Sequence, residues 1–146
     1  MELYVGGSFQ GKLDYVLDKK SWKASSCLIQ EWGADDMESR GAGNAAEDCL
    51  KQLVESRAVV HNHFHKLVAL AIGQGKTLEE IVDAVEIFLE GHPEAVIICD
   101  EVGSGIVPEK QEQRIYREYV GRVLCVAAGK AGHMERIICG IGQVIK

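Results

Sequence analysis

A glycine-rich loop near the start of the chain constrains the fold more than any other stretch. The short apolar run from Glu2 to Val5 leads directly into residues 6–12, which have the spacing Gly-x-x-x-x-Gly-Lys, and a helical pattern follows over residues 12–20. In such a strand, loop and helix unit, backbone N–H groups and the helix N-terminus surround phosphate oxygens. We therefore predict a phosphate-binding P-loop. An ordinary tight turn between strand and helix is the alternative.

The nucleotide contacts predicted from this stretch come from the loop itself. Lys12 is expected to contact the β- and γ-phosphates, with backbone amides around them. Leu13 occupies the position at which a P-loop carries the Ser or Thr hydroxyl that holds Mg²⁺. Phosphate binding and phosphate chemistry are therefore separate questions. The residues assigned to nucleotide binding here are Gly6, Gly7, Ser8, Phe9, Gln10, Gly11, Lys12 and Leu13.

Strand and helix patterns alternate along the chain. Further strands are expected over residues 27–32, 57–60, 95–99 and 136–140, and further helices over residues 44–55, 64–73, 77–91 and 109–130. This alternation favours an α/β fold, a parallel sheet with helices on both faces in a single three-layer domain over residues 1–146. Ligands of such sheets bind beyond the carboxyl ends of the strands.

Composition excludes several classes of protein. With 146 residues, of which 47% are apolar, the chain is long enough for one domain with a buried core. Its net charge of −6 gives no basic field for nucleic acid, and no apolar run reaches the roughly 18 residues of a membrane span. No signal-peptide pattern opens the chain, so we expect a cytoplasmic location. The five scattered cysteines are expected to be small buried hydrophobes: Cys27, Cys49, Cys99, Cys125 and Cys139.

Polar side chains gather at three further places. His61, His63 and His65 follow an expected strand, and they could bind a metal, act in catalysis or be structural. In an extended segment the three would share one face, whereas in a helix only His61 and His65 would. Asp100 and Glu101 follow the apolar run 95–99, so they are expected at the same sheet edge as the loop. The acidic stretch with Asp35, Asp36 and Glu38 is interpreted as a solvated loop, and no metal ligands are assigned.

The stretch after the run 95–99 carries a family resemblance. From Cys99 to Glu109 the chain reads Cys-Asp-Glu-Val-Gly-Ser-Gly-Ile-Val-Pro-Glu. It resembles the Asn-Glu-Val-Gly-x-Gly-(Ile/Val)-Val-Pro stretch of the bifunctional adenosylcobinamide kinase / adenosylcobinamide-phosphate guanylyltransferase family of cobalamin biosynthesis. The next helix is similar to a family run of the form Arg-(x)-Phe-Arg-Asp-x-x-Gly-Arg, through Arg114, Tyr116, Arg117, Glu118, Gly121 and Arg122.

The resemblance implies a RecA-like P-loop fold that binds ATP or GTP. It implies phosphorylation of the aminopropanol hydroxyl of cobinamide, GMP transfer through a guanylylated histidine, and a homo-oligomer, which is a trimer in the family. Three positions depart from the family pattern. Leu13 replaces the hydroxyl residue, His61 replaces a strand-end Asp, and Asn44 occupies the register of the guanylylated histidine.

The hypothesis favoured by the sequence is a short, divergent member of this family that acts on cobinamide or a related corrinoid. Glu101 or Asp100 would orient Mg²⁺ or the attacking hydroxyl, and Arg114 and Arg117 would offset phosphate charge. His61 or His63 would take a catalytic role. Glu101 could instead cap the turn at residues 103–105, and Arg114 could pair with Glu118.

Two alternatives stay open beside this hypothesis. A nucleotide- or corrinoid-binding module without catalysis would explain the loss of the loop hydroxyl and the strand-end Asp together. A histidine-based metal protein would rest on residues 61–65 alone.

Overall fold

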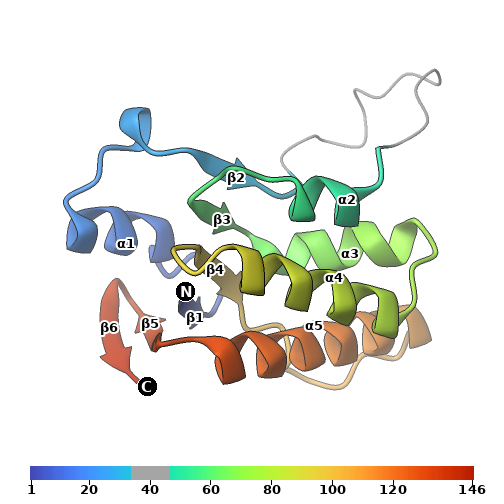
Figure 1. Ribbon diagram of the computed structural model, residues 1–146. Helices are drawn as coiled ribbons and strands as arrows, with labels where there is room; N and C mark the ends of the chain where they lie inside the picture. Colours follow the sequence, from blue (N-terminus) through green and yellow to red (C-terminus); the bar gives the residue numbers. More distant parts are fainter. Residues whose placement is uncertain (34–46) are drawn as a thin grey trace.

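Strand β1 precedes the glycine loop and is a central strand of a six-stranded sheet (Figure 1). This computed structural model describes residues 1–33 and 47–146. The strand order is β2-β3-β4-β1-β5-β6, and all neighbours are parallel except β5 and β6. The strands are β1 (Glu2–Gly6), β2 (Ile29–Glu31), β3 (Val60–Asn62), β4 (Val96–Asp100), β5 (His133–Ile138) and β6 (Ile141–Val144).

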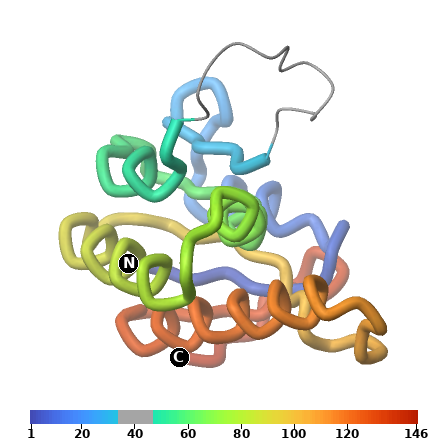
Figure 2. The backbone as a smooth tube through the Cα atoms, turned by 90° about the vertical axis from the view of Figure 1, so that its right-hand side faces the viewer, coloured from blue at the N-terminus to red at the C-terminus, as the bar shows by residue number. Residues whose placement is uncertain are grey.

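Helices cover both faces of the sheet, as predicted. They are α1 (Lys12–Lys20), α2 (Cys49–Val54), α3 (Phe64–Gly73), α4 (Leu78–Gly91) and α5 (Gln111–Lys130), and a short 3₁₀ turn covers Ala24–Ser26. On one face Leu3 and Ile97 pack in a large cluster with side chains of α2 to α5. On the other face Tyr4 and Ile98 pack in a smaller cluster with Val16 of α1. Figure 2 shows α4 and α5 running side by side.

The alternation of side chains along the strands produces these two clusters. Successive residues of a strand point to opposite faces. Both faces of β1 and β4 are covered, so these strands are continuous apolar runs with every residue of β4 buried. The predicted α/β class and parallel core are therefore confirmed.

Several boundaries and one strand differ from the sequence prediction. Strand β5 covers His133–Ile138 rather than residues 136–140, because His133 already pairs with Glu2 of β1. Strand β3 begins at Val60 and includes His61, because these residues pair with β2 and β4. Helix α2 begins at Cys49 rather than at residue 44, since the Asp48 carboxylate accepts the N–H of Leu50 at 3.0 Å and caps the helix. Asn44 and the acidic stretch of Asp35, Asp36 and Glu38 lie outside the described residues.

Strand β6 was not predicted. It returns antiparallel to β5 through a two-residue turn at Cys139 and Gly140, whose φ angles are 51° and 76°. Positive φ at both central residues is what a tight hairpin turn requires, and glycine adopts it without strain. The same turn exposes Cys139, and Cys125 is exposed as well, so only part of the cysteine prediction holds. Cys49 and Cys99 are buried.

Other local signals were interpreted correctly. Thr77 and Glu80 form the predicted capping box at the start of α4, with Thr77 N–H donating to Glu80 Oε2 at 2.7 Å.

None of the helices in the described part of the chain is both long and apolar enough to span a bilayer.

A buried carboxylate ties α1 to the sheet. Glu135 of β5 is 1% exposed, and it accepts hydrogen bonds from Tyr15, Lys19 and His133. Burial alone would raise the pKa of Glu135, but these three hydrogen bonds outweigh it and lower the pKa to about 2. The carboxylate is therefore charged in the folded protein.

Gly6 allows β1 and β5 to approach each other closely. A Cβ at this position would lie 2.4 Å from the backbone carbonyl oxygen of Ile137. We predict that Gly6→Ala lowers the free energy of unfolding by at least about 2 kcal/mol, because neither central strand can shift freely. Urea unfolding measures this. Gly129→Ala is the matched control: nothing lies near its Cβ in α5, so that substitution should be neutral or stabilising. Equal stability of both variants would contradict the prediction.

Glu135 should make the fold acid-sensitive. Its pKa is about 2 when folded against an ordinary value of 4.5, so its contribution to stability is full above about pH 4.5 and is lost as pH falls towards 2. Glu135→Gln should be less stable at pH 7 and should lose less stability on acidification. Urea midpoints between pH 2 and 7 measure this. Glu118→Gln, in an exposed pair with Arg122, should keep the parental pH dependence.

Candidate functional site

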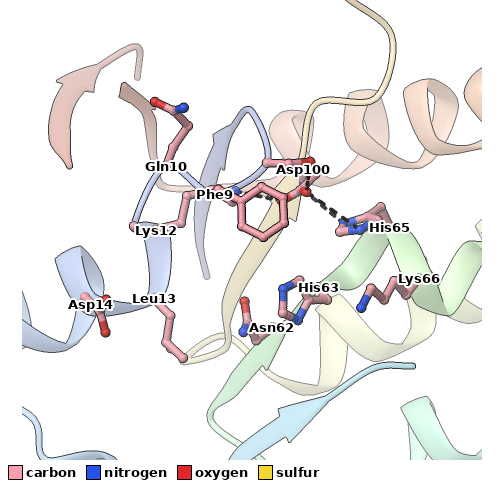
Figure 3. A pocket seen from close by; sticks show the side chains of 12 residues that line it. Phe9, Gln10, Lys12, Leu13, Asp14, Asn62, His63, His65, Lys66 and Asp100 are labelled. Atoms are coloured by element: carbon pink, nitrogen blue, oxygen red, sulfur yellow. Dashed lines mark hydrogen bonds and ion pairs between the residues drawn. The ribbon is translucent and has the colours of Figure 1, made fainter. Parts of the chain in front are cut away.

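The glycine loop borders a pocket of about 460 Å³ at the carboxyl ends of β1, β3 and β4 (Figure 3). Gly11 has φ 70° and is the N-cap of α1, so the chain turns sharply from the loop into the helix. Phe9 has φ 58° and a fully exposed side chain. The residues that line the pocket are Ser8, Phe9, Gln10, Gly11, Lys12, Leu13, Asp14, Asn62, His63, His65, Lys66 and Asp100.

A buried ion pair lies at the base of the loop. Lys12 Nζ is 2.6 Å from Asp100 Oδ1 and donates to the carbonyl oxygen of Gly7 at 2.7 Å. Ser8 Oγ donates to the other carboxylate oxygen of Asp100 at 2.7 Å. Strands β1 and β4 are adjacent, with Gly6 paired to Asp100, which explains how residues distant in sequence meet.

The charge state of Asp100 follows from these contacts. Burial favours the neutral acid, but the hydrogen bonds from Lys12 and Ser8 outweigh burial, so the pKa of Asp100 lies below its usual value. The side chain of Lys12 is only 7% exposed. A lysine at a helix N-terminus, beside a turn of backbone amides, is able to bind an anion such as phosphate.

His65 of α3 makes a hydrogen bond with the backbone of Asp100. Its Nδ1 accepts the N–H of Asp100 at 3.2 Å, which leaves the proton on Nε2, 3.9 Å from Asp100 Oδ2. Burial lowers the pKa of His65 to about 4, although the Asp100 carboxylate opposes this. His65 is therefore neutral at pH 7 and carries its proton on Nε2, on the side of the Asp100 carboxylate.

His63 has a different environment on the same pocket wall. Its Nδ1 lies 2.9 Å from Glu31 Oε2, and the Asn62 amide donates to both oxygens of Glu31, at 2.8 and 3.0 Å. Glu31 ends β2, so three neighbouring strand ends bring polar side chains to this edge of the sheet. In Figure 3, His63 lies between Asn62 and Lys66.

His61, predicted as a catalytic candidate, lies in the hydrophobic core instead. It is fully buried, its ring stacks on Trp32, and it contacts Phe88 edge to face. Its Nε2 lies 3.1 Å from the carbonyl oxygen of Ala58, and burial lowers its pKa to about 4. His61 points into the core under α3 and α4, whereas His63 and His65 line the pocket at the edge of the sheet, so the three histidines do not share one environment. Among the described residues, no group of three or more His, Cys, Asp or Glu could hold a metal ion.

Three residues that the sequence analysis assigned to the site do not line the pocket: Glu101, Arg114 and Arg117. Glu101 accepts from Ser104 at 2.9 Å and pairs with Arg136 at 3.1 Å, which agrees with the capping alternative. Arg117 donates to the carbonyl oxygens of Gly103, Gly105 and Ile106. Arg114 donates to those of Pro108 and Glu109, rather than to Glu118. Both arginines therefore shape the turn after β4.

Sequence reasoning missed two groups at the site. Glu31 was not proposed, although it lies near the carboxyl end of the predicted strand 27–32, and a carboxylate at a strand end is the signal that indicated Asp100. The turn between β5 and β6 was also missed: Gln10 Oε1 accepts the N–H of Cys139 at 2.6 Å, and the Gln10 carbonyl accepts that of Gly140 at 3.0 Å. These two hydrogen bonds attach the glycine loop to the turn between β5 and β6.

Comparison with known proteins gives two matches. A family model described as Cobinamide kinase / cobinamide phosphate guanyltransferase matches residues 36–145, about three quarters of the chain. The Bifunctional adenosylcobalamin biosynthesis protein CobU of Escherichia coli (strain K12) is 41% identical over 51 residues, which cover 35% of this chain and 28% of that protein. The family match begins after the glycine loop, so the loop is supported by its own geometry alone.

The Lys12–Asp100 pair should be strongly coupled in stability. Lys12→Met leaves a buried carboxylate without its cation, so we expect a loss of about 3 kcal/mol in the free energy of unfolding. Adding Asp100→Asn removes the unpaired charge and should recover part of that loss. Urea unfolding of both single variants and the double variant measures the coupling. Additive single effects would contradict the assignment of Lys12 and Asp100 as an ion pair.

Proposed function

Because the chain belongs to the cobinamide kinase / cobinamide phosphate guanyltransferase family, we propose that it binds ATP or GTP at residues 6–12 and acts as a transferase on cobinamide or a related corrinoid. The observation that carries this proposal is the buried Lys12, held at the N-terminus of α1 by Asp100 at the floor of an open pocket. A lysine in this place supplies positive charge where the β- and γ-phosphates of a nucleotide would lie.

The roles of the loop residues follow from its shape. Backbone N–H groups between Gly7 and Gly11 would donate to phosphate oxygens, and Lys12 would exchange part of its contact with Asp100 for the phosphate. His65, which accepts the backbone N–H of Asp100 at Nδ1, would keep Asp100 in place as Lys12 moves. The acceptor, a corrinoid hydroxyl, would enter from the side of His63 and Lys66.

A magnesium ion is the usual companion of a nucleotide in such sites, and the described oxygen donors fit it. The Asp100 carboxylate and the Ser8 hydroxyl lie 2.7 Å apart at the pocket floor, and Mg²⁺ prefers oxygen ligands and keeps several waters. These two groups would hold the ion, whose charge would offset that of the phosphates. Leu13 provides no ligand, so Ser8 is the hydroxyl that the loop offers in its place.

A second candidate function is a nucleotide- or corrinoid-binding module that has lost phosphoryl and guanylyl transfer. Two observations favour it. Leu13 lines the pocket with an apolar side chain, and His61, at the position of a family Asp, points into the core. GMP transfer would need a histidine acceptor, and the sequence has Asn44 in that register. Phosphorylation is therefore the first activity to test.

We also propose a homo-oligomer in the cytoplasm, a trimer by family resemblance. Exposed apolar side chains gather along β6 and its neighbours, at Ile138, Ile141, Val144 and Ile145, and they would be covered in an assembly. All five cysteines are free thiols, which fits a reducing compartment. Light scattering of the purified chain tests the oligomeric state.

The proposed activity predicts turnover of cobinamide by the purified protein. With Mg²⁺ and labelled ATP or GTP, label should appear in phosphocobinamide. Lys12→Ala should weaken nucleotide binding in calorimetry by about tenfold or more, because a charged hydrogen bond is lost. Lys130→Ala, on the far end of α5, is the matched control and should bind as the parent does. Binding without turnover would select the module over the enzyme, and absence of binding would contradict both.

A further inference from the structure

We propose that His63 is the general base of the transfer reaction and that Glu31 positions it. This inference rests on the proposed function, since it names the group that takes the proton from the acceptor hydroxyl. Neither the family match nor the CobU relative assigns a role to these residues.

The hydrogen bonds fix the tautomer of His63. A carboxylate can only accept hydrogen bonds, so the 2.9 Å contact between Glu31 Oε2 and His63 Nδ1 requires the proton on Nδ1. Nε2 then carries the lone pair, and among the described residues it has no hydrogen-bond partner. Because His63 lines the pocket, that lone pair is available to a bound hydroxyl.

The Glu31 carboxylate is itself held in place. The Asn62 amide donates to both of its oxygens, and β2 and β3 pair in parallel with Glu31 opposite Asn62. The carboxylate therefore has a fixed orientation towards the imidazole. A carboxylate that orients a histidine and stabilises its protonated form is the arrangement that general-base catalysis uses in many unrelated enzymes.

The backbone of His63 is strained in a way that presents the ring to the pocket. Its φ and ψ of 54° and 40° lie in the left-handed region, which is unfavourable for a non-glycine residue. This conformation turns the chain from β3 into α3. It leaves the His63 side chain 40% exposed, whereas that of His65 is 9% exposed. Strain of this kind persists where the surrounding contacts determine it.

The other two histidines of the cluster cannot serve as the base. The lone pair of His65 is occupied, because Nδ1 accepts the Asp100 N–H, and burial lowers its pKa to about 4. His61 is enclosed by Trp32 and Phe88 in the hydrophobic core and does not line the pocket. His63 alone of the three combines an available nitrogen with access to the pocket.

The proposed step balances as follows. The acceptor hydroxyl gives its proton to His63 Nε2 while its oxygen forms a bond to the γ-phosphorus of the nucleotide. The bond between that phosphorus and the bridging oxygen of the β-phosphate breaks, and the nucleoside diphosphate leaves with the electron pair. The imidazolium then releases its proton to water.

His63→Asn tests the base directly, and asparagine also tolerates the left-handed conformation, so the fold should be kept. We expect kcat to fall by about 10²- to 10⁴-fold while nucleotide affinity in calorimetry is unchanged. His92→Asn is the matched control, because His92 stacks on Phe88 outside the pocket, and it should keep the rate within about twofold. An unchanged rate in His63→Asn, with an active parent, would overturn the proposal.

The tautomer of His63 separates a positioning role of Glu31 from a structural one. Glu31→Gln should lower kcat by about tenfold or more while nucleotide affinity in calorimetry is unchanged. A glutamine side chain can donate as well as accept, so the Nδ1–H tautomer of His63 should be less populated in Glu31→Gln than in the parent, which nitrogen-15 NMR measures. A lower kcat with the parental tautomer populations would overturn the role of Glu31.

Nitrogen-15 NMR of the labelled parent tests the geometry without turnover. His63 should show the Nδ1–H tautomer and His65 the Nε2–H tautomer in the same sample. An Nε2–H form of His63 would overturn the positioning by Glu31. If nucleotide binds but the parent has no activity, the enzyme function fails and the base role with it. Activity that survives in His63→Asn overturns this inference alone.

Discussion

The ion pair between Lys12 and Asp100 is the constraint on which the rest of the site depends. Both charged side chains are largely buried, and burial of a charge is costly. The pair is stable because each side chain makes a further hydrogen bond in addition to the ion pair. Lys12 also donates a hydrogen bond to the carbonyl oxygen of Gly7, and Asp100 also accepts one from the Ser8 hydroxyl. The loop between β1 and α1 thus takes its shape around the pair. The same contact fixes Lys12 at the N-terminus of α1, where the proposed nucleotide would place its phosphates.

The sequence predicted the parts of the fold that depend on local chemistry. The glycine spacing predicted the loop, the apolar run before Asp100 predicted a buried central strand, and Thr77 with Glu80 predicted a capped helix. Each signal is contained within a few residues. Parallel pairing of β1 and β4 then placed Asp100 beside Lys12, as the rule for the carboxyl ends of strands requires.

The failures arose where distant contacts decide the outcome. His61 follows an apolar pair and looks like a strand-end ligand, but pairing with β2 and β4 extends the strand and turns the ring into the core. Arg117 was assigned to phosphate, yet the carbonyl groups of a glycine turn are nearer to it. Glu31 lies three strands from the loop, and nothing in its neighbours indicates His63 as its partner.

The unequal covering of the sheet affects how the protein opens. Helix α1 and the small cluster around Tyr4 and Ile98 bury much less apolar surface than the layer of α2 to α5 on the other face. Local opening is easiest where the fewest apolar contacts are lost, so amides of the α1 layer should exchange with solvent before those of the opposite layer. The glycine loop belongs to this weaker layer. A ligand that contacts both Lys12 and His63 would therefore stabilise the α1 layer against this local opening.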